Sequence, residues 1–216
     1  MLHGRVVRKL EALYDRILAA GHPEPTILPL DLAIAKAEDF ANVASALQAQ
    51  HGRVDAIVHT AVLLGSLGPI EHQAFDSWLA TLQRGPAGTV RPDARALLSL
   101  LRAAPDASVT FTLDTRGQEP KAFWGAYARR QGGIVGAAAP SSRTNGKTSR
   151  RCACQRRGAR PMRSPLRAQT HPGDDITRLP SPEAFLPLYL VSHQRPAEKR
   201  KRRCHRRPTL VAKRAG

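Results

Sequence analysis

The chain of 216 residues is long enough for one domain of ordinary size with its own hydrophobic core. It contains no run of about 18 apolar residues and no basic-then-apolar leader, so we expect neither a membrane span nor secretion, and the cytoplasm is the expected location. The three cysteines are an odd number, which argues against a disulfide framework.

The net charge of +17 is concentrated in two blocks of the sequence. Residues 1–127 are nearly neutral, whereas residues 128–163 contain no acidic residue and residues 191–216 contain a single one. All the cysteines lie in these two blocks as well. The charge distribution therefore predicts an ordinary globular part and separate basic segments.

The first elements follow from hydrophobic spacing and from helix-stopping residues. Apolar residues three and four positions apart predict an amphipathic helix over 6–20, which Gly21 and Pro23 end. The apolar run over 26–30 predicts a strand, although Pro29 removes one ladder hydrogen bond.

The alternation of helix and strand continues through the near-neutral part of the chain. It predicts helices over 37–50, 75–83 and 94–103, strands over 54–59 and 108–112, and a last helix over 182–190. Gly52 is expected to end the second helix. Residues 84–93 interrupt the pattern, because their glycine and proline residues are typical of turns. No strand is expected between Tyr127 and the last helix. This alternation is typical of an α/β fold with a parallel sheet and right-handed crossovers.

Six short stretches, in a consistent order and spacing, resemble one known family. They are residues 2–5, 30–32, 54–61, 64–71, 123–127 and 161–165. Together they resemble the short-chain dehydrogenase/reductase family over residues 2–127 and 161–190. The resemblance implies a Rossmann-like parallel sheet with flanking helices, NADP or NAD as cofactor, and a small carbonyl or alcohol substrate.

The resemblance assigns the general acid/base to Tyr127, although packing against Trp124 without a chemical role is the alternative. Four residues later, where the family has a lysine, stands the neutral Gln131, which cannot stabilise a tyrosinate by charge. The position of the family's serine holds Asp114, with Thr115 beside it as a substitute hydroxyl donor. A carboxylate there opposes the negative charge that develops on the substrate oxygen, so impaired or absent turnover is expected.

The same resemblance places six residues against the cofactor: Arg5, Asp31, Leu32, Thr60, Ala61 and Ser164. Arg5 stands where a basic residue favours the 2′-phosphate of NADP, and a solvated loop arginine is the alternative. Asp31 and Leu32 would flank the adenine, and Ser164 the nicotinamide amide. Val62 replaces a glycine that allows close backbone approach. The family's glycine-rich turn belongs before residue 1, so we expect an incomplete fold without its first βαβ unit.

The resemblance stops after Tyr127 and resumes at Pro161 at nearly preserved length. This is typical of out-of-frame translation of GC-rich DNA, and we hypothesise compensating frameshifts around residues 84–93, 128–160 and 191–216. The alternative is a non-catalytic basic polypeptide that binds nucleic acid non-specifically through its phosphates.

The expected organisation is an incomplete Rossmann-like domain over residues 1–190 and a disordered basic tail over 191–216. Cys152, Cys154 and Cys204 with His205 lack the spacing of a structural zinc site, so no metal is expected. Weak homo-oligomerisation is the expectation for sheet-flanking helices.

Overall fold

The computed structural model describes residues 1–32, 34–62, 64–83, 96–114, 121–129, 131–133, 152–159 and 161–194. Within these residues the strands form two parallel sheets, of order β1-β2 and β3-β4-β5. Their bounds are β1 (Leu2–Gly4), β2 (Ile27–Pro29), β3 (Ala56–His59), β4 (Ala107–Asp114) and β5 (Cys152–Ala159). The predicted α/β fold with parallel strands is confirmed.

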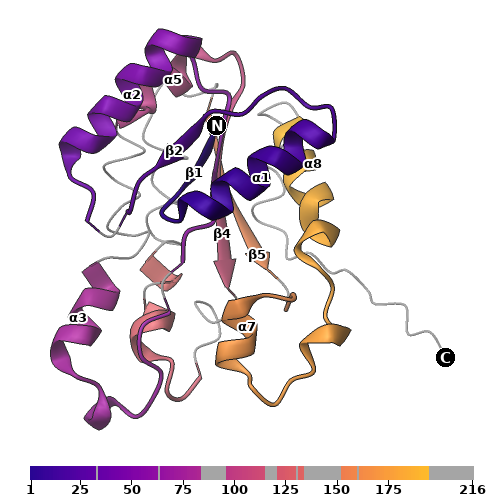
Figure 1. The fold of residues 1–216 in the computed structure, drawn as a ribbon. Helices are drawn as coiled ribbons and strands as arrows, with labels where there is room; N and C mark the ends of the chain where they lie inside the picture. Colours follow the sequence, from indigo (N-terminus) through magenta and orange to yellow (C-terminus); the bar gives the residue numbers. More distant parts are fainter. Residues whose placement is uncertain are drawn as a thin grey trace.

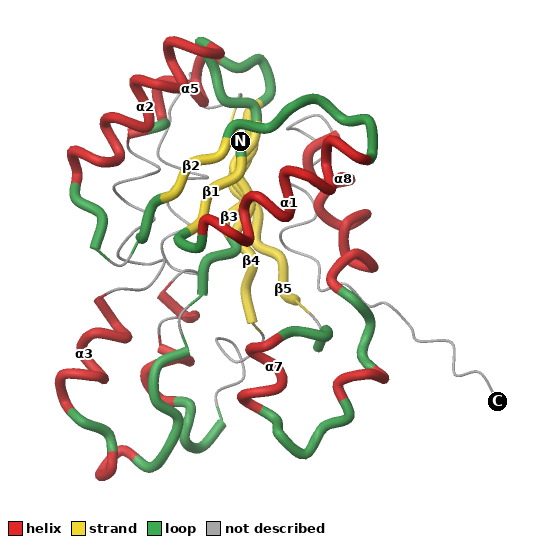
Figure 2. The backbone as a smooth tube through the Cα atoms, in the orientation of Figure 1, coloured by secondary structure: helices red, strands yellow, loops and turns green. Residues whose placement is uncertain are grey.

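Helices cover both faces of the strands (Figure 1). Their bounds are α1 (Val7–Ala19), α2 (Ala37–His51), α3 (Phe75–Gln83), α5 (Leu98–Ala103), α7 (Pro165–Thr170) and α8 (Leu186–Gln194), with single 3-10 turns at Ile70–His72, Ile176–Arg178 and Pro182–Phe185. Figure 2 shows α2 and α5 on one side of the strands, α1 and α8 on the other, and α3 and α7 beyond their carboxyl ends. None of the described helices is long and apolar enough to cross a bilayer.

Local chemistry explains where α2 begins and ends. The carboxylate of Asp39 accepts a hydrogen bond of 2.7 Å from the backbone N–H of Lys36, and it lies in the first turn, where a negative charge suits the helix dipole. Gly52 ends the helix with φ at +66°, a conformation that glycine adopts without steric cost. The predicted end of this helix at Gly52 is confirmed.

The hydrophobic core is built around β4, whose first five residues are all buried. Two neighbouring clusters, which share contacts with Val54 and Ile57, comprise Leu101, Ala104, Ala107, Val109, Phe111 and Leu113, and Leu47, Leu97 and Leu100. On the other face, the hydroxyls of Thr112 and Tyr189 lie 2.8 Å apart and join α8 to β4. A strand buried on both faces is typical of a parallel sheet.

The expectation that no strand follows Tyr127 before the last helix is wrong. Residues 152–159 form β5, which pairs with β4 along its whole length, from Cys152 opposite Ala107 to Ala159 opposite Asp114. The sequence of β5 has neither alternating apolar residues nor β-branched ones, so local preference does not indicate a strand. Pairing with a buried neighbour determines its conformation.

Candidate functional site

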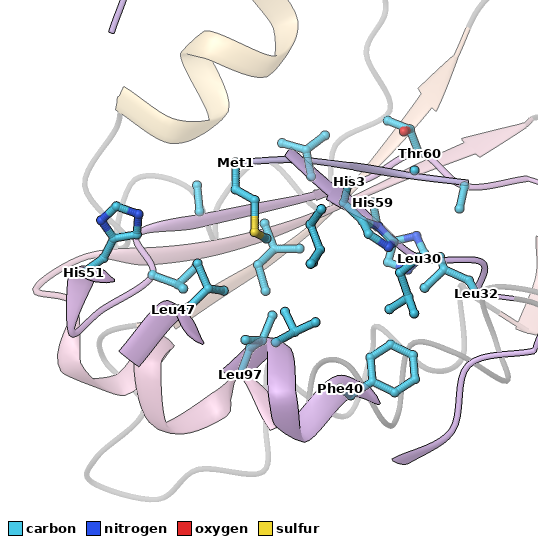
Figure 3. A pocket seen from close by; sticks show the side chains of 18 of the residues that line it. Met1, His3, Leu30, Leu32, Phe40, Leu47, His51, His59, Thr60 and Leu97 are labelled. Atoms are coloured by element: carbon cyan, nitrogen blue, oxygen red, sulfur yellow. The ribbon is translucent and has the colours of Figure 1, made fainter. Parts of the chain in front are cut away.

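A cavity of about 930 Å³ lies between β1 and β3 (Figure 3). One wall is apolar and comes from α2 and from the residue before α5, namely Phe40, Val43, Leu47 and Leu97. The remaining lining comes from β1, β2 and β3, from the residues that flank these strands, and from the last two residues of α2. Strand edges and helix side chains that are far apart in the sequence thus enclose one space.

Five of the six residues predicted to contact a cofactor line this cavity: Arg5, Asp31, Leu32, Thr60 and Ala61. Each follows the carboxyl end of a strand by one to three positions, since Arg5 follows β1, the pair at 31–32 follows β2, and the pair at 60–61 follows β3. A hydrogen bond of 3.0 Å from the Leu30 N–H to the Gly4 carbonyl keeps the ends of β1 and β2 together. Ligands of open α/β sheets bind at this edge of the strands.

The amino end of α1 adds a positive potential beside Arg5. The helix begins at Val7, two positions after Arg5, and its first turn contains no acidic side chain. Val6 at the N-cap provides no side-chain acceptor for the first N–H groups. An uncapped helix amino terminus beside a guanidinium favours an anion.

The structure describes two of the predicted catalytic residues, Tyr127 and Asp114, and they are hydrogen-bonded to each other, while Asp114 is also bonded to Gln131. The Tyr127 hydroxyl donates to a carboxylate oxygen of Asp114 at 3.1 Å, and the Asp114 N–H donates to the Gln131 Oε1 at 3.3 Å. Tyr127 is 1% exposed and Gln131 2% exposed. Trp124 packs edge-on against the Tyr127 ring, with centroids 5.5 Å apart. Thr115 lies outside the described residues.

Ser164 does not line the cavity. Its hydroxyl is the N-cap of α7 and accepts a hydrogen bond of 3.1 Å from the Arg167 N–H. The ring of His171, which follows α7, lies 5.8 Å from the Trp124 ring, so α7 is next to the group around Tyr127. Ser164 therefore has a structural partner, while its predicted contact with nicotinamide stays a prediction.

The chain is similar to known oxidoreductases both in sequence and in structure. No family model matches the chain. The oxidoreductase YciK of Escherichia coli strain K12 is 28% identical over 190 residues, which are 88% of this chain and 74% of that protein. A short-chain dehydrogenase from Pseudomonas syringae is 28% identical and superposes with a TM-score of 0.83, over 89% of this chain and 77% of that one. A short-chain dehydrogenase from Escherichia coli CFT073, complexed with NADPH, is 27% identical with a TM-score of 0.81, over 93% and 81%.

Over most of its length, the chain is similar in sequence and in fold to short-chain dehydrogenases. The predicted resemblance and the predicted Rossmann-like fold are confirmed.

Two parts of the site were not identified from the sequence of this chain. The helical periodicity of residues 37–50 indicated an apolar face, but not that Phe40, Val43 and Leu47 would line a cavity instead of a filled core. The anion-favouring amino end of α1 was also missed. A helix start with no acidic residue directly after a basic one was the available signal.

Proposed function

We propose that this chain descends from an NADP(H)-dependent oxidoreductase, keeps the adenosine end of the cofactor site, and is impaired in hydride transfer. The observation that supports the proposal most is the convergence of Arg5, Asp31, Leu32, Thr60 and Ala61 on one cavity at the carboxyl ends of the strands. Relatives of the family with solved structures are complexed with NADPH and with NADP. The substrate class is a small carbonyl compound or alcohol.

The residues present fit the adenosine end of the cofactor. The guanidinium of Arg5 and the uncapped start of α1 would hold the 2′-phosphate, which carries two negative charges near neutral pH. Asp31 and Leu32, both partly buried, would lie against the adenine. These contacts favour NADP(H) over NAD(H), since only the former has the 2′-phosphate.

The described residues that line the cavity fit the pyrophosphate of the cofactor less well than they fit its adenosine end. Gly4 is the only glycine among the described residues that line the cavity. Val62, which lines the cavity and is 43% exposed, carries a branched side chain where close backbone approach is needed. We therefore infer that the affinity of this chain for the whole dinucleotide comes mainly from its adenosine end.

The hydrogen bonds of Tyr127 support impaired turnover. When bound, the cofactor supplies the hydride, and the protein has to supply the proton for the substrate oxygen. Here the Tyr127 hydroxyl donates a hydrogen bond to Asp114, and that carboxylate repels the negative charge of a tyrosinate. Gln131 accepts the Asp114 N–H and brings no positive charge to compensate.

Calorimetric titration with 2′,5′-ADP and 5′-ADP tests the cofactor part of this proposal. We expect 2′,5′-ADP to bind more tightly, and Arg5→Ala to weaken it about 10-fold while leaving 5′-ADP unchanged, because only the phosphate contacts are lost. Arg53→Ala is the matched control, since Arg53 also lines the cavity but pairs with Asp55 at 3.3 Å. Equal affinity of the wild-type protein for both nucleotides would refute the assignment.

We also propose that residues 84–93, 128–160 and 191–216 arise from out-of-frame translation. Most of their side chains lie outside the described residues, so non-specific nucleic-acid binding stays a prediction of the sequence. Translating the coding DNA in its other frames tests the proposal. A family-like lysine four residues after Tyr127 in another frame supports it, and its absence from every frame refutes it.

A further inference from the structure

Three polar residues at the end of α7 are joined by hydrogen bonds that form a closed circle. The Arg167 guanidinium and the His171 Nε2 lie 3.1 Å apart, and the Nδ1 of the same imidazole lies 2.8 Å from the Thr170 hydroxyl. That hydroxyl donates in turn to the Arg167 carbonyl at 3.4 Å. We call these three residues the α7 cluster.

The contact with Arg167 determines the protonation state of His171. A guanidinium has donors and no acceptor, so the His171 Nε2 has to accept its hydrogen bond. The proton of the neutral imidazole then lies on Nδ1, from which it is donated to the Thr170 hydroxyl. A second proton, on Nε2, would point at the guanidinium and place two cations in contact. The α7 cluster is therefore complete only while His171 is neutral.

Two carboxylates lie in this neighbourhood, and each is bonded to another group. Asp174, in the turn after α7, pairs with the Arg167 Nη2. Asp114, at the end of β4, accepts a hydrogen bond from the Tyr127 hydroxyl. The charge in direct contact with an imidazole nitrogen of His171 is that of Arg167, and repulsion from it opposes protonation of the ring.

His171 also connects α7 to the segment that contains Tyr127. Its ring centroid lies 5.8 Å from that of Trp124, and the Trp124 ring packs against Tyr127 with centroids 5.5 Å apart. The loop around α7 is tied together at its ends, because the Arg163 N–H donates to the Pro180 carbonyl at 2.9 Å. A change at His171 therefore acts on the contact with Trp124, inside a loop whose ends stay joined.

We propose that the α7 cluster is a proton-sensitive latch, in which neutral His171 holds α7 against Trp124 and protonated His171 releases it. Protonation breaks the hydrogen bond with Arg167, opens the circle and exposes Trp124. The contribution of the cluster to stability is present while His171 is neutral, and it is lost as the pH falls through the range of about 8 to 5 in which histidine side chains titrate. The latch is independent of the proposed function, because it involves neither cofactor nor substrate.

Trp124 reports the state of the latch once the other tryptophan is replaced. The chain contains two tryptophans, and the Nε1 of Trp78 has no hydrogen-bond partner among the described residues, so Trp78→Phe removes no described hydrogen bond. In this background, acrylamide quenching of Trp124 should rise about twofold between about pH 8 and pH 5. Over the same range, amide protection of Ala168 and His171, which donate to carbonyls of the α7 segment, should fall about tenfold.

His171→Gln separates the latch from other effects of acid. The glutamine amide accepts from Arg167 and donates to Thr170 at every pH, so the transition should disappear and α7 should stay closed. His22→Gln, at an exposed histidine after α1, is the matched control and should keep the transition. Thr170→Val should shift the transition to higher pH, because the neutral imidazole loses its acceptor.

Three results would overturn the proposal. They are the absence of any transition in the Trp78→Phe protein, a transition that persists in His171→Gln, and an unshifted transition in Thr170→Val. Circular dichroism at each pH ensures that only folded protein is compared.

Discussion

The phenol of Tyr127 donates a hydrogen bond of 3.1 Å to the carboxylate of Asp114, the last residue of β4. The same aspartate donates its backbone N–H to Gln131, so a partly buried chain of hydrogen bonds joins β4 to the helical segment after Trp124. A carboxylate partner stabilises the protonated phenol, which is the opposite of what a general base requires.

Replacing both partners of Tyr127 should raise its catalytic competence. In the double variant Asp114→Ser with Gln131→Lys, the repelling carboxylate is removed and a cation is placed four residues after the tyrosine. We expect NADPH-dependent carbonyl reduction to rise about 100-fold, the lower end of what general acid/base catalysis contributes. The measurement is NADPH absorbance with a panel of small aldehydes and ketones. Adding Tyr127→Phe to the double variant should abolish the gain, and a gain that survives would show that the phenol is not the acid.

Gly65, in the loop after β3, should tolerate a side chain poorly. Its φ is +72°, and an added Cβ would overlap the Thr81 side chain, with Thr81 Cγ2 at 2.8 Å. Gly21 has the same φ of +72° with nothing within 4 Å of its Cβ position. We expect Gly65→Ala to lower the free energy of unfolding by about 2 kcal/mol more than Gly21→Ala, because only the former adds overlap to backbone strain. Equal losses in urea denaturation would contradict this.

Phe123 has a strained backbone close to the group around Tyr127. Its φ is +71°, a region in which bulky residues are rare, and its carbonyl accepts the Gly68 N–H at 3.1 Å. We expect Phe123→Gly to raise Tm by about 3 °C, since relief of about 1 kcal/mol has that effect in a domain of this size. Phe123→Ala is the control, because it removes the ring but keeps the Cβ. A comparable rise in the alanine variant would show that the ring, and not the backbone, is responsible.

The hydroxyl of Tyr14 donates to Glu24 at 2.5 Å, and this hydrogen bond raises the pKa of Tyr14 above its ordinary value of 10.0. A raised pKa in the folded state means that the bond contributes fully below pH 10 and that its contribution is lost as the pH rises through the folded-state value. In a spectrophotometric titration, Tyr14 should ionise at a higher pH in the wild-type protein than in the Glu24→Gln variant. Identical titration curves would contradict the assignment.

Hydrophobic periodicity predicted the helices α1, α2 and α3 within one residue of their observed ends. It failed for β5, whose residues carry no strand pattern, and for the six-residue α7, which is too short for a periodic signal. In both cases the structure depends on contacts with segments that are distant in the sequence, such as the pairing of β5 with β4.

The candidate site was predictable only as separate pieces. Asp31 and Thr60 each follow a predicted strand, whereas Arg5 lies in a stretch for which only the family resemblance was available, and parallel strands bring such residues to one edge of a sheet. The cavity itself was not predictable, because its walls combine β1 and β3 with one face of α2. The hydrogen bond between Tyr127 and Asp114 depends equally on tertiary packing, across 13 positions of sequence.

Competition between NADPH and 2′,5′-ADP tests the central claim most directly. If this chain binds the cofactor mainly through Arg5 and its neighbours, 2′,5′-ADP should displace NADPH completely, and the two Kd values should agree within about threefold, because the nicotinamide half adds little. The readout is NADPH fluorescence in the wild-type protein. Binding of NADPH about 100-fold tighter than 2′,5′-ADP, together with turnover that Tyr127→Phe abolishes, would contradict the account.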